Sequence, residues 1–125
     1  MPIQMSNVLG PLIDNPSVLP DATVQTPFVN STPALGTTQE TAAPLTGEIT
    51  LIPNNTTANG VILPVGLKGQ RMFLYPQLAT NAPKVYPPVG GTINGGAVNA
   101  NGTAAAQVMK YYICVSDDGL QWIST

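Results

Sequence analysis

The sequence predicts an all-β protein: a small β-sandwich or barrel-like module that follows an extended, proline-rich N-terminal arm. Three observations favour this fold class. The 12 glycines and 13 prolines among the 125 residues lack the three-residue period of collagen, and they disfavour long helices. Short runs rich in β-branched and aromatic residues recur with turn residues between them. The length fits one domain with a sizeable core.

Residues 1–44 are expected to form the arm, and residues 45–125 the β domain. Each proline fixes φ, removes a backbone donor and biases the preceding residue away from helix, so we expect no regular element before residue 45. The prolines of this segment are Pro2, Pro11, Pro16, Pro20, Pro27, Pro33 and Pro44. Apolar residues are also scattered through it, so we expect the arm to lie against another surface.

The first strands of the domain are expected in 47–52 and 61–65. In the first run, Ile49 and Leu51 alternate with polar residues, which predicts that these two side chains form the buried face. In the second run, Pro64 cannot donate to a ladder, so it places the strand at a sheet edge or ends it early.

The run 70–75 predicts a strand with two apolar faces. Met72 and Leu74 occupy one face, and Phe73 and Tyr75 place aromatic rings on the other. We therefore expect both faces of this strand to be partly covered.

The segment 84–96 predicts strand, tight turn, strand and a second turn. Prolines set the backbone for the first turn, and glycines supply the positive φ that other residues resist. The run 107–115 predicts a central strand because most of its residues are apolar or aromatic. It continues into a hairpin with 120–123, for which Asp118 and Gly119 favour a two-residue turn of the primed type.

No set of side chains points to catalysis, so we expect no enzyme and no catalytic residue. The chain contains no histidine, which excludes a histidine-dependent triad. Asp117 and Asp118 are adjacent in a turn, where Asp usually accepts hydrogen bonds from local backbone amides. Cys114 lies within a strand pattern between apolar residues, which favours a small buried hydrophobe over a nucleophile.

We also expect no metal and no cofactor. One cysteine, no histidine and no acidic cluster leave no ligand set for zinc or calcium. No Lys-Ser/Thr pair or helix pattern follows the four glycines of 90–96, which favours turns over a phosphate cradle. Four Asn-x-Ser/Thr sequons carry no weight without an export signal: Asn30, Asn54, Asn55 and Asn101.

The aromatic side chains leave two alternatives open, a sugar-binding platform or core packing, with core packing favoured for most of them. They are Tyr75, Tyr86, Tyr111, Tyr112 and Trp122. With four basic and six acidic residues and a net charge of −2, the chain lacks the basic patch that nucleic acid or anionic lipid requires. We expect a soluble protein with no membrane span, whose charge-poor surface suits packed assemblies.

The segment 81–94, NAPKVYPPVGGTIN, is followed by Gly95, by a strand ending in 111–114 and by Trp122. This order resembles a recurrent β-module of tailed-bacteriophage virion structural proteins. In that module a strand ending in Val-Tyr-Pro, a glycine turn, Thr-Ile-Asn-Gly, a small-residue run and a closing strand with a late Trp follow one another. The resemblance marks the virion structural class and does not separate capsid decoration proteins from tail-fibre or tail-tip proteins.

Together with the proline-rich arm and the charge-poor composition, the resemblance favours a capsid decoration, or cement, protein that binds the head shell through its arm and its β-module. The implied partner is the lattice of the major capsid protein, with this chain bound as a homo-oligomer, most simply a trimer, at capsid symmetry axes. Its location would be the virion, assembled in the cytoplasm of the bacterial host. The alternative is a tail-fibre or tail-tip module that binds host surface glycan.

Overall fold

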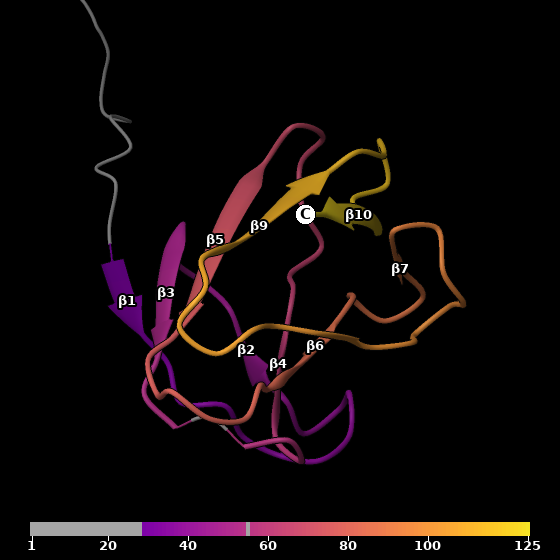
Figure 1. Ribbon diagram of the computed structural model, residues 1–125. Helices are drawn as coiled ribbons and strands as arrows, with labels where there is room; N and C mark the ends of the chain where they lie inside the picture. The colour runs from indigo at the N-terminus through magenta and orange to yellow at the C-terminus, as the bar shows by residue number, and fades with distance from the viewer. Residues whose placement is uncertain (1–28, 55) are drawn as a thin grey trace, which may run out of the picture.

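The computed structural model describes residues 29–54 and 56–125, and these residues form ten strands and no helix (Figure 1). This confirms the all-β prediction for the part of the chain that is described. The strands are β1 (Val29–Ser31), β2 (Ala43–Pro44), β3 (Ile49–Ile52), β4 (Gly60–Ile62), β5 (Arg71–Pro76), β6 (Lys84–Tyr86), β7 (Thr92–Ile93), β8 (Gly102–Thr103), β9 (Lys110–Cys114) and β10 (Gln121–Ser124).

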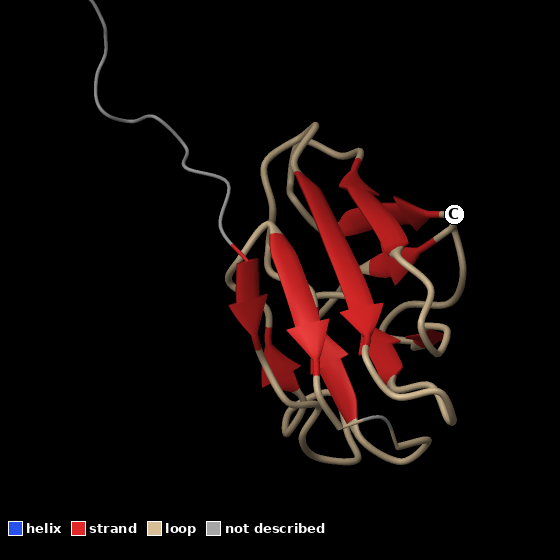
Figure 2. Ribbon diagram, turned by 60° about the vertical axis from the view of Figure 1, so that its left-hand side comes forward, coloured by secondary structure: helices blue, strands red, loops and turns tan. Residues whose placement is uncertain are grey.

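The strands form two mixed sheets, between which the chain alternates. One sheet has six strands in the order β1-β3-β5-β9-β10-β7, and the other has four in the order β2-β4-β6-β8 (Figure 2). Consecutive strands up to β9 therefore lie in different sheets, and only β10 returns beside its predecessor. As a result β1, β3 and β5 run parallel to one another, as do β2, β4 and β6. The crossover that each parallel pair requires is supplied by a strand of the other sheet.

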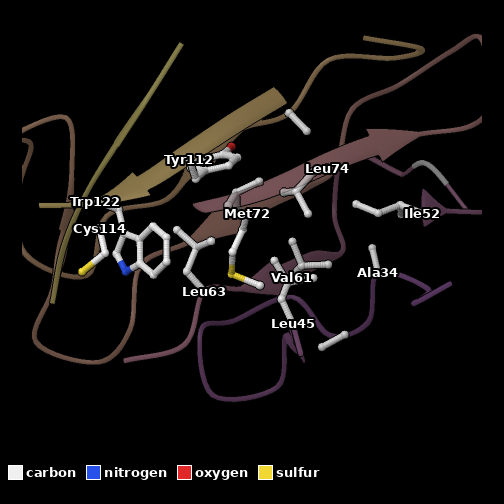
Figure 3. Close-up of a cluster of buried hydrophobic side chains, with 13 residues drawn as sticks. Ala34, Leu45, Ile52, Val61, Leu63, Met72, Leu74, Tyr112, Cys114 and Trp122 are labelled. Carbon is white, nitrogen blue, oxygen red and sulfur yellow. The ribbon is translucent and has the colours of Figure 1, made fainter. Parts of the chain in front are cut away.

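A single hydrophobic core is built from both sheets (Figure 3). The four-stranded sheet contributes Val61 and Val85, both at 0% exposure. The six-stranded sheet contributes larger side chains at 0 to 2% exposure: Ile52, Met72, Leu74, Tyr112 and Trp122. Burying these side chains is the main source of stability for a chain with few charges.

The predicted strand in 47–52 forms, but its buried face is the opposite one. Thr50 and Ile52 are buried in β3, whereas Ile49 and Leu51 are half-buried on the other side. The expectation for Ile49 and Leu51 was therefore wrong. The reason is register: Thr50 pairs with Leu74, whose side chain faces the core, and partners in a ladder share a face.

The predictions for the next two strands are confirmed. β4 ends at Ile62, before Pro64, and lies inside its sheet between β2 and β6, so the proline ends the strand early. In β5, Met72 and Leu74 are buried, while Phe73 and Tyr75 are half-buried on the second face.

The order strand, turn, strand, turn in 84–96 is also confirmed. The Gly91 amide donates to the Pro88 carbonyl at 2.7 Å and closes the first turn, in which Gly90 has φ 85°. The Gly96 amide donates to the Ile93 carbonyl at 3.0 Å and closes the second. The two strands lie in different sheets, so the first turn carries the chain across the core.

The β9–β10 hairpin forms, but its turn is not the predicted two-residue primed type. The Gly119 amide donates to the Ser116 carbonyl at 3.2 Å, and the Val115 amide donates to the Gln121 carbonyl at 2.8 Å, so the loop covers 116–120. A type I′ turn needs positive φ at both central residues. Gly119 has φ 77°, whereas Asp118 is not among the positive-φ residues, so it cannot form that turn.

The segment 29–44 was expected to belong to an arm without regular elements, and this is wrong for those residues. β1 pairs with β3 and β2 pairs with β4, so the segment adds an edge strand to each sheet. Its prolines do not prevent this, because Pro33 lies between the strands and Pro44 ends an edge strand, where a missing donor is tolerated. Residues 1–28 of the expected arm lie outside the described residues.

Candidate functional site

Asp118 accepts hydrogen bonds within its own turn, as predicted. The Ser116 hydroxyl donates to Oδ1 at 2.7 Å, and the Leu120 amide donates to the same atom at 3.0 Å. These two hydrogen bonds, the Ser116 bond foremost, hold the pKa of the Asp118 carboxyl below its ordinary value. Asp117 is exposed, and its carboxylate lies 3.6 Å from the Lys68 ammonium. Asp118 therefore organises the hairpin loop, whereas Asp117 makes only an exposed ion pair, of a kind that adds little to stability.

Cys114 is part of the core, on the opposite side of β9 from solvent. It is fully buried and pairs with Trp122 across the β9–β10 ladder. Its Sγ lies 3.8 Å from the Ser116 carbonyl oxygen. This placement confirms the prediction of a small buried hydrophobe.

The four glycines considered for a phosphate cradle are turn residues. Gly90 and Gly95 have φ of 85° and 70°, and a side chain at Gly91 would clash with the Leu120 carbonyl. Within 29–54 and 56–125, no three metal-ligating side chains cluster, no pocket is found, and no helix long and apolar enough to cross a membrane occurs.

The five candidate platform aromatics do not share a surface. Trp122, Tyr112 and Tyr86 are buried, and the Tyr86 hydroxyl donates to the Thr37 carbonyl at 3.2 Å. Burial raises the pKa of Tyr112 well above its ordinary value. Core packing is therefore confirmed for these three, whereas Tyr75 and Tyr111 are half-buried on the other face of the six-stranded sheet.

This other face of the six-stranded sheet carries a cluster of half-buried apolar side chains, and we call it the outer face. It carries two half-buried apolar or aromatic side chains on each of three neighbouring strands, β3, β5 and β9. No other strand covers these strands on that side in Figure 2. The six residues are Ile49, Leu51, Phe73, Tyr75, Tyr111 and Ile113.

Register aligns these side chains into rows across the strands. Ile49 pairs with Phe73, and Phe73 pairs with Tyr111, so the three lie side by side. The Phe73 and Tyr111 rings meet edge to face, with centroids 5.0 Å apart and planes at 68°. This edge-to-face arrangement is a favourable one for aromatic pairs.

The outer face continues onto the flanking strands and carries little charge. Val29 on β1 extends it at 62% exposure, and Ile123 on β10 at 46%. Among the outward positions of β1, β3, β5, β9 and β10, Arg71 is the one charged side chain. The sequence indicated the second face of β5 but placed Ile49 and Leu51 inside, so the extent of the surface was missed.

Comparisons with known proteins assign no relative to this chain: no family model, no curated protein and no solved structure matches it. What the chain does must therefore be inferred from the outer face, the composition and the segment 81–95.

Proposed function

We propose that this chain is a structural protein of a tailed-bacteriophage virion and acts as a capsid decoration, or cement, protein. The observation that carries the proposal is the resemblance of NAPKVYPPVGGTING, with the later Trp122, to the β-module of that class. In this chain the resembling segment forms β6, a glycine turn and β7, and Trp122 lies in the core beside β7.

The surface chemistry supports a protein lattice as the partner. A chain with ten charged residues has little like-charge repulsion between copies, and the outer face offers apolar area for contact. Many copies on a repeated lattice gain avidity from modest individual contacts. The proposal includes a homotrimer bound to the major capsid protein at symmetry axes of the virion. In this proposal residues 1–28 extend from the β domain to contact neighbouring capsid subunits.

For the domain itself we propose a β-sandwich in preference to a barrel. Both sheets end in strands with one unpaired side, β1 and β7 in one sheet and β2 and β8 in the other. A closed barrel has no such edges. An experimental structure in which β1 and β7 pair with β2 and β8 would overturn this assignment.

Binding to phage heads that lack the protein tests the decoration role. We expect the full chain to bind saturably, with a copy number that scales with the number of capsid subunits. A chain without residues 1–28 should lose most of this binding, because the reaching segment is gone. Lys68→Gln, an exposed neutralisation in the loop before β5, serves as the control that keeps residues 1–28. Undiminished binding of the truncated chain would overturn the role of the arm.

A tail-fibre or tail-tip protein that binds host glycan is the second candidate. Tyr75 and Tyr111 favour it, because they place two aromatic rings with hydroxyl groups on the outer face, as sugar-binding platforms do. Binding to a glycan array distinguishes a glycan-binding tail protein from a capsid decoration protein. A hit that Tyr111→Ala abolishes, together with a copy number set by the tail, favours this candidate over decoration.

A further inference from the structure

The outer face is unusual for a surface that borders solvent. A mixed or antiparallel sheet with one open face normally alternates apolar residues inside with polar residues outside. Here the outward positions at the centre of the sheet are Ile49, Phe73 and Tyr111, and the position beside them on β1 is Val29. Contiguous apolar surface of this kind marks an interaction site.

The chain outside the described residues begins at the margin of this face. β1 starts at Val29, which lies in the same row as Ile49 and is the outermost residue of that row. The 28 preceding residues span up to about 90 Å when extended. The distance from β1 to β9 is three strand spacings, about 14 Å. The segment is therefore long enough to return across its own sheet.

The composition of residues 1–28 matches the outer face. The segment is rich in large apolar side chains, among them Leu9, Leu12, Ile13, Leu19, Val24 and Phe28. Its only charged residues are Asp14 and Asp21, whereas the outer face carries the single cation Arg71. Arg71 is exposed and forms no ion pair with any described residue. Residues 1–28 thus supply apolar side chains for contact with the outer face and a carboxylate for contact with Arg71.

We propose that, in the free protein, residues 1–28 lie on the outer face of their own six-stranded sheet, with an acidic residue of the segment near Arg71. A tethered segment has an effective concentration in the millimolar range, well above that of a second copy in dilute solution, so the chain's own segment occupies the face. This inference concerns the free protein and does not depend on the proposed function.

Paramagnetic relaxation in the full chain tests the placement. A nitroxide is attached to Ser17→Cys, and wild type treated with the same reagent is the control, because Cys114 is fully buried. We expect loss of the amide signals of Phe73 and Tyr111, and retention of those of Val61 and Val85 in the other sheet. No loss on the six-stranded sheet would overturn the proposal.

A mixed sample separates the chain's own segment from that of a second copy. Isotope-labelled wild type is combined with unlabelled, nitroxide-bearing S17C, so that any signal loss must come from another molecule. We expect no loss in this sample. Loss at Phe73 and Tyr111 here would assign the face to a neighbouring copy and overturn the proposal.

A pair of charge neutralisations tests the contact with Arg71. Arg71→Gln in the nitroxide-bearing chain should reduce the signal loss at Phe73 and Tyr111. Lys68→Gln, an exposed neutralisation in the loop before β5, should leave it unchanged. Equal signal loss in the two variants would overturn the role given to Arg71.

Discussion

Two polar atoms in the core make no hydrogen bond with any described residue, the Thr50 hydroxyl and the Trp122 indole nitrogen. Both residues are at 0% exposure. A buried polar group without a partner costs about 1 to 3 kcal/mol. The ladder partner of Thr50 on β5 is Leu74, whose side chain has no polar atom, and its partner on β1 is Asn30, whose amide donates to Thr32 and Thr46 instead. Single residues thus lower the stability of a core that is otherwise apolar.

Thr50→Val should raise the free energy of unfolding by about 1 kcal/mol, because it removes the unpaired hydroxyl and keeps the branched shape. The midpoint of urea denaturation measures the change. Thr50→Ser is the control: it keeps the hydroxyl, loses a buried methyl group and should lower the midpoint. A lower midpoint for Thr50→Val than for wild type would contradict the prediction.

Tyr112 should make the fold sensitive to alkali. Its pKa is raised above the ordinary value of 10.0 by burial, so the folded state keeps a proton that the unfolded state releases above that pH. The free energy of unfolding should therefore be unaffected by Tyr112 below about pH 10 and fall as the pH rises further. Denaturant unfolding at a series of alkaline pH values measures this, and Tyr112→Phe should make the fall less steep. An equally steep fall in that variant would show that Tyr112 is not responsible.

At the scale of elements, the turn between β6 and β7 links the two sheets at a point of close backbone approach. The Gly91 amide closes the turn on Pro88, and the Thr92 amide then donates to the Leu120 carbonyl at 3.0 Å. A side chain at Gly91 would meet that same carbonyl. The pairing of β7 with β10 therefore depends on the absence of a side chain at this glycine.

Gly91→Ala should cost about 2 to 3 kcal/mol of stability, because the added methyl group forces β7 away from β10. Gly95→Ala is the matched control in the next turn. Its φ is 70° but nothing lies within 4 Å of the added carbon, so it should cost only the left-handed strain, about 1 kcal/mol. Thermal denaturation of the two variants compares the costs. Equal costs would mean that the Leu120 contact does not matter.

For the whole molecule, stability depends on pairs that are distant in sequence. Ile49 pairs with Phe73, and Phe73 pairs with Tyr111. Because the chain alternates between sheets, no two consecutive strands before β9 support each other in a ladder. Folding must close long loops before these contacts form, which is typical of slowly folding all-β domains. Removing one strand from each sheet should accordingly affect the entire fold.

Two truncations test where the folded part begins. Deleting residues 1–28 leaves all ten strands, so unfolding should stay cooperative. Deleting residues 1–44 removes β1, β2 and the buried Ala34, and cooperative unfolding should be lost. Circular dichroism during thermal denaturation distinguishes the two. Cooperative unfolding of the shorter chain would restore residue 45 as the start of the domain.

Local features of the sequence were enough to predict the strand class, the positions of β5 and β6, the turns at Gly90 and Gly95, and the burial of Cys114. The strand predicted over 107–115 forms only as β9 (Lys110–Cys114), because Gln107 has φ 52° and residues 107–109 precede the ladder. Alternation, proline chemistry and glycine φ preferences act over a few residues, so they can be interpreted without the fold. The buried side of β3, the loop of the hairpin, the strands within 29–44 and the outer face were decided by tertiary structure. Each depends on register with a distant strand, and a shift of one residue exchanges the two faces.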